Sequence, residues 1–279
     1  MPDILLHLAF PILASVLYAG LGFHFWQTRW QPTQPATTIL AMRGWERTAI
    51  GIALLLQGMG LHDVLFGNGG MRFSFSLALS LMLWLAVLIY WLESFRSRTD
   101  GLQPAVLPFA ALCALFPVFF PQSRLIAHAN AWGFKLHFLA AMLAYSLFTL
   151  SALQAGFMSA VEKSLHRKTT SPFLSSLPPL LRMETLLFRL IGAGFVLLSI
   201  ALGSGILFSE AIFDRAVSFD HKTVFAFVSW LIFAALLTGR QVYGWRGRIA
   251  LRWTLAGFLL LILAYIGSRF VSEVVLGRV

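Results

Sequence analysis

Three histidines stand at or near the ends of long apolar segments, and their side chains are the ones that could do chemistry. His62 closes one apolar run, in GMGLHDVLFGNGG, and His137 lies about one helical turn inside another, in AWGFKLHFLAAMLAYSLF. His221 opens a third run, in FDHKTVFAFVSW. Ionisable groups at this depth are costly in lipid and usually have a function. The three positions therefore predict a ligand site near one membrane surface.

Haem ligation is the chemistry that suits these residues. Imidazole is the commonest metal ligand, and two imidazoles from facing helices can bind haem iron on both axial sides. We expect His137 and His221 to be the axial ligands, with His62 as the substitute for either. Lys135 and Lys222 stand close to the two ligands in sequence and would pair with the haem propionates. The aromatic residues that would wall the ring are Trp132, Phe134, Phe138, Phe219, Phe225 and Phe227.

Other interpretations of the histidines stay open at this point. A zinc site would need three or four ligands with Cys or carboxylates close by, and the sequence has neither an HExxH nor a CxxC pattern. A histidine at a helix end in the interfacial zone is often only a snorkelling or capping residue. Asp220 would in that case simply cap the helix that His221 opens, since helix N-termini favour acidic residues.

The elements that must position these side chains are membrane-spanning helices. The chain has 279 residues, of which 58% are hydrophobic and 11% charged, whereas an ordinary soluble domain carries about 25% charged residues. A span needs about 20 largely apolar residues. We expect an all-α fold, a polytopic transmembrane helical bundle that forms one integral-membrane domain over residues 1–279. The eight expected spans are 4–26, 40–61, 73–93, 104–121, 132–160, 183–208, 222–239 and 250–274.

Two of these spans have unusual composition. The fourth is short and carries Pro104, Pro108, Pro117 and Pro121, which predicts a broken or kinked helix because proline frees backbone groups that neighbours must satisfy. The sixth carries glycines at 192, 194, 203 and 205, which would let another helix approach closely.

Lysine and arginine predict the orientation of the spans. Cytoplasmic loops carry the excess of these residues, so both termini are expected to face outward from a bacterial inner membrane, with the first helix retained. The net charge of +10 is not interpreted as nucleic-acid binding, because the basic residues lie in short loops between apolar runs. The inside set is Arg29, Arg43, Arg47, Arg96, Arg98, Lys163, Arg167, Lys168, Arg182, Arg240, Arg246, Arg248 and Arg252, against Arg72, Arg124, Arg215, Lys222, Arg269 and Arg278 outside.

The segment YGWRGRIALRW, residues 243–253, is predicted to anchor the chain at the cytoplasmic membrane surface. Its three arginines would meet anionic lipid at about 1 kcal/mol each, and its two tryptophans would lie in the interface. The alternative is a docking site for a cytoplasmic partner.

Several segments resemble those of a known family. FDHKTVFAFVSW resembles the segment W-D-P-K-E-T-W-A-F-x-x-W of the CcsA-type cytochrome c assembly proteins, the membrane haem handlers of system II. The helix that begins at His137 resembles the family's H-V-x-x-M-x-x-x-S/G-Y-A helix. The shorter HemX/YpjD branch is closer still over residues 198–210, 221–225, 243–253 and 263–271. The letters shared with the CcsA-type segment are Asp220, Ala226, Phe227 and Trp230.

The chain also departs from the CcsA-type pattern. The external loop that is tryptophan-rich in that family is here SEAIFDRAVSFD, with no tryptophan, and Thr238 stands where the family has a further histidine. His221 occupies what is a proline in the family segment. The resemblance implies the fold and haem contact, and it argues against haem lyase activity.

The functional expectation is an inner-membrane accessory protein of cytochrome c assembly that binds or handles haem at the outer face, with membrane lipid and cytochrome c assembly proteins as partners. The alternative is a non-catalytic membrane scaffold or regulator that binds a protein, for example in tetrapyrrole synthesis. A transporter is less favoured, because Arg189 is the main charge in mid-span and no inverted repeat is visible. Catalysis is also less favoured, since the sequence shows no Ser/His/Asp set, no carboxylate pair in a span and no phosphate loop.

Overall fold

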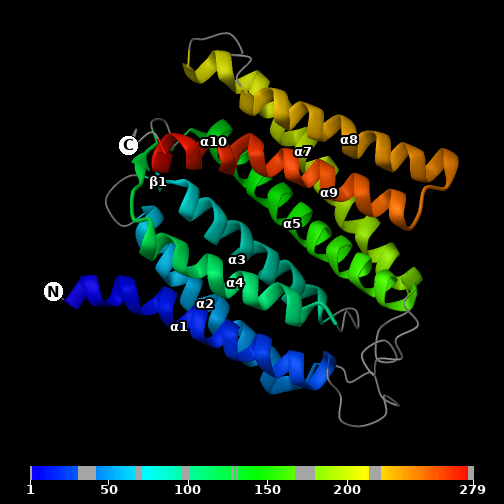
Figure 1. Ribbon diagram of the computed structural model, residues 1–279. Coiled ribbons are helices and arrows are strands. Elements are labelled where there is room, and N and C mark those ends of the chain that lie inside the picture. The colour runs from blue at the N-terminus through cyan, green and yellow to red at the C-terminus, as the bar shows by residue number, and fades with distance from the viewer. Residues whose placement is uncertain are drawn as a thin grey trace.

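The chain folds as a bundle of long helices that run side by side (Figure 1), so the expected all-α class is confirmed. Among the residues that the structure describes, seven helices are long and apolar enough to cross a membrane, and an eighth, of 17 residues, is shorter but also apolar. The computed structural model describes residues 2–30, 42–66, 71–95, 101–126, 129, 131–166, 180–213 and 221–275.

The first four helices pack together as one half of the bundle. Within it, α1 lies against both α2 and α4, and α3 lies against α4 and α2. Its elements are α1 (Pro2–Phe25) with the π-helical turn η1 (Trp26–Trp30), α2 (Gly44–Phe66), α3 (Phe75–Glu93) and α4 (Gln103–Phe119).

The second half of the bundle is built on α5 (Trp132–His166). This helix packs along α7 and against α9, while α8 packs mainly on α9 and α7. The two halves meet chiefly where α3 contacts α5, in the middle of Figure 1. The remaining elements are α7 (Leu180–Phe213), α8 (His221–Tyr243), α9 (Arg248–Ile262), η2 (Leu263–Gly267), α10 (Ser268–Phe270) and η3 (Val271–Val275).

A two-residue strand pair marks one end of the bundle, which we call the β end. β1 (Arg72–Phe73) pairs antiparallel with β2 (Arg124–Leu125), with Arg72 opposite Leu125. This pair ties the α2–α3 connection to the α4–α5 connection. Helix α1 begins and η3 finishes at the same end (Figure 1), so both ends of the described chain lie on one side of the bundle.

The core of the second half depends on two glycines that face aromatic rings. The rings of Phe148 on α5 and Phe233 on α8 stack with their centroids 3.9 Å apart. A Cβ at Gly194 would lie 3.1 Å from Phe148, and one at Gly257 would lie 2.9 Å from Phe233. The expected close approach at the α7 glycines is therefore found at Gly194, because only a residue without a side chain leaves room for the stacked pair.

The fourth helix corrects the expectation of a break at its prolines. α4 is an unbroken α-helix, although Pro108 and Pro117 lie inside it. Pro104 stands in the first turn, where the missing N–H would have had no helical partner. The Pro108 ring packs against Gly22 of α1. A Cβ at Gly22 would lie 3.1 Å from this ring, so the glycine leaves the space that the ring needs. A neighbouring helix thus fills the space beside the proline, and the helix continues.

Two helices are longer than their apolar runs. The expected spans 132–160 and 183–208 lie within α5 and α7, which have 35 and 34 residues. At 1.5 Å per residue each is about 50 Å long, well beyond the roughly 30 Å hydrocarbon core of a bilayer. Hydropathy identifies only the apolar part of a helix. It therefore could not predict where α5 and α7 begin and end.

Candidate functional site

His137 lies at the β end of α5 and is held against α7. Its Nδ1 lies 3.0 Å from the carbonyl oxygen of Ala201 and 3.1 Å from Oγ of Ser204. A carbonyl oxygen only accepts hydrogen bonds, so Nδ1 carries the proton and donates it. Gly205 leaves space for the ring, because a Cβ there would lie 3.3 Å from the imidazole Cε1. Three neighbouring residues of α7 thus fix the position of one imidazole.

This arrangement defines the tautomer of His137. With the proton on Nδ1, the lone pair of the neutral imidazole is on Nε2, and Nε2 makes no hydrogen bond with any residue that the structure describes. Histidines that bind metals almost always donate the other ring N–H to a carboxylate, carbonyl or water, which fixes the ring and raises its basicity. His137 therefore fits the role of one axial ligand to haem iron.

His62 has a different environment from His137. Its side chain is 72% exposed and its Nδ1 lies 3.8 Å from Oδ1 of Asp63, the next residue. Its ring lies 5.6 Å from that of Phe66 on the same helix. No contact between His62 and His137 occurs among the described residues. The structure places both histidines toward the β end but does not bring them together.

The second predicted ligand can be placed only by its backbone. His221 is the first residue of α8, and this helix begins at the β end (Figure 1). The side chain of His221 and the whole of Asp220 lie outside the described residues. The predicted propionate partners Lys135 and Lys222 are both exposed.

Helices α5 and α8 contact the same stretch of α7. The indole Nε1 of Trp230 on α8 donates to Oγ of Ser199 at 2.8 Å, and its ring stacks on Phe195 with centroids 5.4 Å apart. Ser199 stands two residues before Ala201, whose carbonyl oxygen accepts the hydrogen bond from His137. Phe227 also stacks on Trp230, at 5.8 Å. Two of the residues that carried the family resemblance therefore pack beside the helix segment that orients His137.

The aromatic residues expected around haem differ in their surroundings. Phe134 and Phe138 stack on each other at 6.0 Å, and Phe138 meets the buried Phe73 of β1 edge to face at 5.0 Å. These two rings are part of the contact between α5 and the first half of the bundle. Trp132 is instead largely exposed. Phe219 lies outside the described residues.

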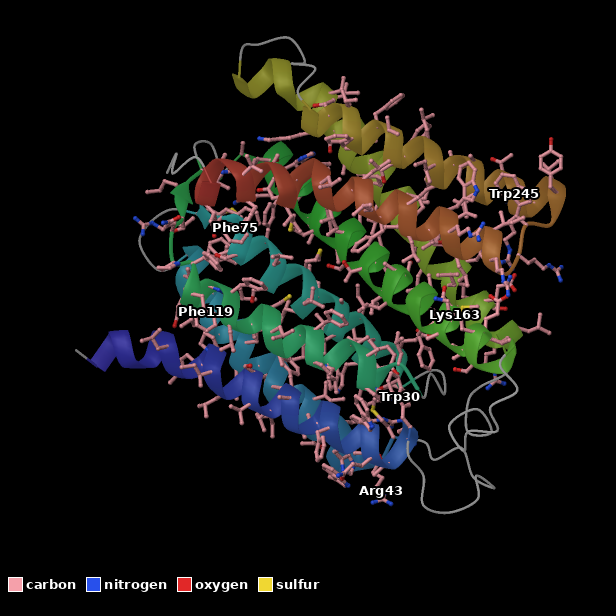
Figure 2. The ribbon with its side chains drawn as sticks, in the orientation of Figure 1. Trp30, Arg43, Phe75, Phe119, Lys163 and Trp245 are labelled. Atoms are coloured by element: carbon pink, nitrogen blue, oxygen red, sulfur yellow. The ribbon has the colours of Figure 1, made fainter. Side chains whose placement is uncertain are left out.

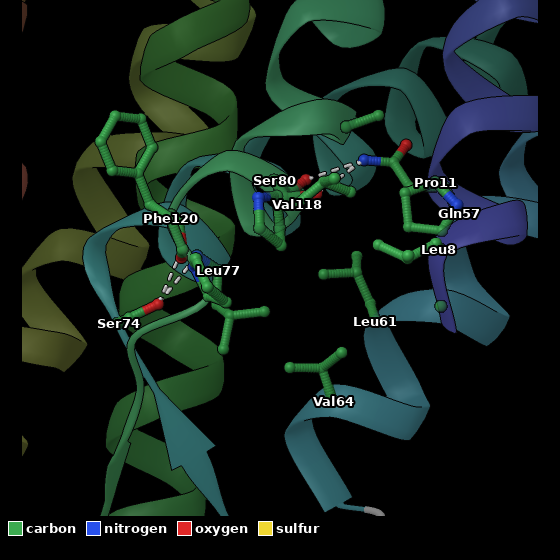
Figure 3. Close-up of a pocket in the computed structure, with 15 residues that line it drawn as sticks. Leu8, Pro11, Gln57, Leu61, Val64, Ser74, Leu77, Ser80, Val118 and Phe120 are labelled. Atoms are coloured by element: carbon green, nitrogen blue, oxygen red, sulfur yellow. Dashed lines mark hydrogen bonds between the residues drawn. The ribbon is translucent and has the colours of Figure 1, made fainter. Parts of the chain in front are cut away.

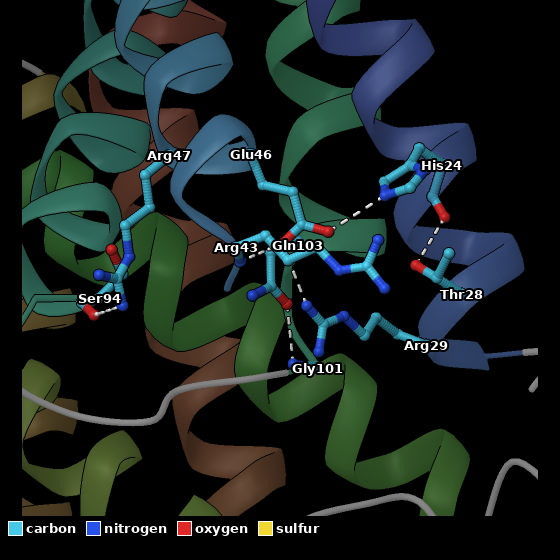
Figure 4. Close-up of polar contacts among 9 residues, drawn as sticks. All are labelled: His24, Thr28, Arg29, Arg43, Glu46, Arg47, Ser94, Gly101 and Gln103. Carbon is cyan, nitrogen blue, oxygen red and sulfur yellow. Dashed lines mark hydrogen bonds and ion pairs between the residues drawn. The ribbon is translucent and has the colours of Figure 1, made fainter. Parts of the chain in front are cut away.

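A buried polar cluster at the end opposite the β end was not singled out from sequence (Figure 4). The Glu46 carboxylate, 2% exposed, accepts hydrogen bonds from three groups. These are Nε2 of His24 at 3.1 Å, the Arg29 guanidinium at 3.2 Å and the backbone N–H of Arg43 at 2.7 Å. In the sequence, the signal for this cluster is Glu46, a lone carboxylate at the start of an apolar helix. A buried carboxylate needs a hydrogen-bonding or charged partner.

A cavity of about 180 Å³ lies within the first half of the bundle (Figure 3). Its polar lining includes Gln57, whose Nε2 donates to the carbonyl and Oγ of Ser80 at 3.2 and 3.0 Å. The amide oxygen of Gln57 has no hydrogen-bond partner in the described part of the chain. His62, His137, Lys135 and Lys222 do not line this cavity.

The described residues include no group of three or more His, Cys, Asp or Glu side chains that could hold a metal ion. A haem needs only axial ligands from the protein, so this finding bears on zinc-like sites and not on His137.

Comparison with known families shows which family the chain belongs to. Residues 46–276 match the family described as Cytochrome C assembly protein. The chain belongs to this family. The match runs from the start of α2 past η3 and includes His62, His137 and His221. The predicted relationship is therefore confirmed.

Individual proteins are similar to this chain over different lengths. Inner membrane protein YpjD of Escherichia coli K12 is 29% identical over 238 residues, which cover 83% of this chain and 89% of YpjD. A 28.8 kDa protein of Azospirillum brasilense is 30% identical over 209 residues, 71% of this chain and 76% of that protein. Cytochrome c biogenesis protein CcsA of Prochlorococcus marinus AS9601 is 38% identical over 90 residues, 32% of this chain and 29% of CcsA. The similarity to YpjD thus extends over nearly the whole chain, and that to CcsA over a third of it.

Proposed function

We propose that this chain is an inner-membrane accessory protein of cytochrome c assembly that binds haem at the outer face of the membrane. The observation that carries the proposal is the geometry of His137. Its Nδ1–H donates to the Ala201 carbonyl, which orients the ring and leaves the Nε2 lone pair as a ligand. Membership of the cytochrome c assembly family supports the biological role.

The remaining parts of the proposed site come from the β ends of two helices. His221 begins α8 and is the proposed second axial ligand, with His62 as its substitute. Lys135 and Lys222 would pair with the propionates, because ammonium groups attract carboxylates. When bound, haem supplies an iron that takes up imidazole nitrogens on both faces. Ser204 supports His137 by offering Oγ at 3.1 Å from Nδ1.

The outer face is assigned from charge. The β end carries both ends of the described chain (Figure 1), and those basic residues counted as inside that the structure describes concentrate at the opposite end. Figure 2 labels two of them, Arg43 and Lys163, far from Phe75 and Phe119. The positive-inside rule then gives an N-out, C-out topology with His137 near the outer surface.

The test is an absorbance spectrum of the purified protein with and without substitutions. Bis-imidazole ligation gives a low-spin spectrum. We expect His137→Ala to lose haem or to convert it to a five-coordinate form, and added imidazole to restore the low-spin form. His24→Ala is the matched control, because His24 lies at the opposite end of the bundle and should leave the spectrum unchanged. A protein without haem, in which His137→Ala changes neither haem uptake nor cytochrome c maturation, contradicts the proposal and leaves the scaffold function.

A further inference from the structure

A basic hollow lies between α5 and α9, at the end of the bundle opposite the β end. Its volume is about 290 Å³. Three cationic side chains, one carboxylate, one serine and two leucines line it. The lining residues are Ser159, Glu162 and Lys163 of α5 with Arg248, Leu251, Arg252 and Leu255 of α9. We call this feature the α5–α9 hollow.

The charges of the hollow favour an anion. Arg248 Nε donates to the Glu162 carboxylate at 2.7 Å, with Arg248 59% and Glu162 26% exposed. Lys163 and Arg252 are exposed and form no ion pair with any described residue. Three cations against one carboxylate leave a net charge of +2 around the hollow. A single anionic group with several oxygens could contact more than one of these cations at once.

Charged and apolar residues of α9 line the hollow together. The four α9 residues recur at intervals of three and four, so they share one face of the helix. Arg248 stands in the first turn and Leu255 two turns further into the bundle. Along this face the order from the helix end is Arg248, Leu251, Arg252 and Leu255, so the deepest of the four residues is apolar. An amphiphile with its charged headgroup at the two arginines would have its acyl chain beside Leu255.

The surroundings give the depth of the hollow. The rings of Trp245 and Trp253 lie 5.3 Å apart beside the start of α9, and tryptophans are enriched at membrane–water interfaces. Trp245 is fixed by its backbone N–H, which donates to the Gly239 carbonyl at 3.2 Å. The first N–H groups of α9 have no acceptor within the helix and add partial positive charge. These features support placing the hollow at the depth of lipid phosphates.

We propose that the α5–α9 hollow binds the headgroup of an anionic phospholipid. The Arg248 and Arg252 guanidinium groups present forked donors that suit phosphate oxygens, and Lys163 adds a point charge. Leu255, which is exposed, contacts the first part of an acyl chain. Basic pockets between transmembrane helices on the cytoplasmic side bind anionic headgroups in this way. The proposal concerns a defined site, and it holds whether or not the chain binds haem.

Native mass spectrometry of the full-length protein, titrated with phosphatidylglycerol, tests the site. Each basic side chain near a phosphate contributes about fivefold in affinity. We expect Arg252→Gln to weaken binding about fivefold, and Lys163→Gln combined with Arg252→Gln to weaken it about 25-fold. Arg246→Gln is the matched control, because Arg246 is exposed in the same segment but does not line the hollow. It should change binding less than twofold.

Two further arms make the test decisive. Glu162→Gln removes the negative charge of the hollow and should strengthen phosphatidylglycerol binding severalfold, which a misfolded variant could not do. Phosphatidylcholine with the same acyl chains and soluble glycerol phosphate should both bind much more weakly. Equal losses in Arg252→Gln and Arg246→Gln would indicate diffuse surface attraction and overturn the site. Binding of glycerol phosphate as tight as that of the lipid would overturn the lipid assignment.

Discussion

Gly205 of α7 is the most sensitive position for testing how His137 is held. An alanine Cβ at this position would lie 3.3 Å from Cε1 and 3.6 Å from Nδ1 of the imidazole. Carbon atoms in optimal contact are about 3.5–4.0 Å apart, so the ring must move by about 0.2–0.7 Å. That movement lengthens or bends the 3.0 Å hydrogen bond from Nδ1 to the Ala201 carbonyl.

The expected magnitudes follow from two opposing terms. Replacing a helical glycine by alanine stabilises the helix by about 1 kcal/mol, and weakening one intramolecular hydrogen bond costs about 1 kcal/mol. Gly205→Ala should therefore leave the free energy of unfolding almost unchanged. Gly203→Ala is the matched control in the same helix, because nothing lies within 4 Å of its Cβ. It should stabilise the protein by about 1 kcal/mol, as measured by denaturation in mixed micelles.

Haem affinity should separate the two variants more clearly than stability does. Loss of the hydrogen bond that orients a ligating histidine typically weakens metal binding by about 10-fold to 100-fold. We expect haem titration to show about tenfold weaker binding in Gly205→Ala and no change in Gly203→Ala. Equal haem affinity in the two variants would refute the argument that the Ala201 contact prepares His137 as a ligand.

Two further predictions concern the end opposite the β end and the orientation of the bundle. Glu46→Gln should destabilise the protein by about 3 kcal/mol, because it leaves the Arg29 charge partly buried without its carboxylate; denaturation in mixed micelles measures this. A reporter that is active only in the cytoplasm, fused after Val279, should stay silent, because the loop charges place the C-terminus outside.

Each of these predictions has a clear contrary outcome. Glu162→Gln is the control for Glu46→Gln, since an exposed ion pair contributes only about 0–1 kcal/mol, and equal losses in both would mean that burial of Glu46 has no energetic role. A bright cytoplasmic reporter would reverse the topology and move His137 to the inner face.

The sequence by itself determined the helices and their order. Long apolar runs predict spans because a bilayer excludes backbone groups that are not hydrogen-bonded within a helix. The eight expected spans overlap α1 to α5 and α7 to α9. Family motifs were equally visible, because they are local strings such as the one around Trp230. Hydropathy gave the apolar part of α5 and missed its continuation to His166, since helices continue in water as well as in lipid.

Only the tertiary structure decided which side chains meet. His137 bonds to a carbonyl 64 residues away, and His24 bonds to a carboxylate 22 residues away across two helices. His62 looked equivalent to His137 in sequence, yet its side chain is exposed. Such contacts depend on the rotation of each helix about its axis and on the choice of its neighbours. Small residues such as Gly205 and the interlocking of side-chain ridges set the rotation of a helix and its neighbours. A single apolar run does not specify that rotation or those neighbours.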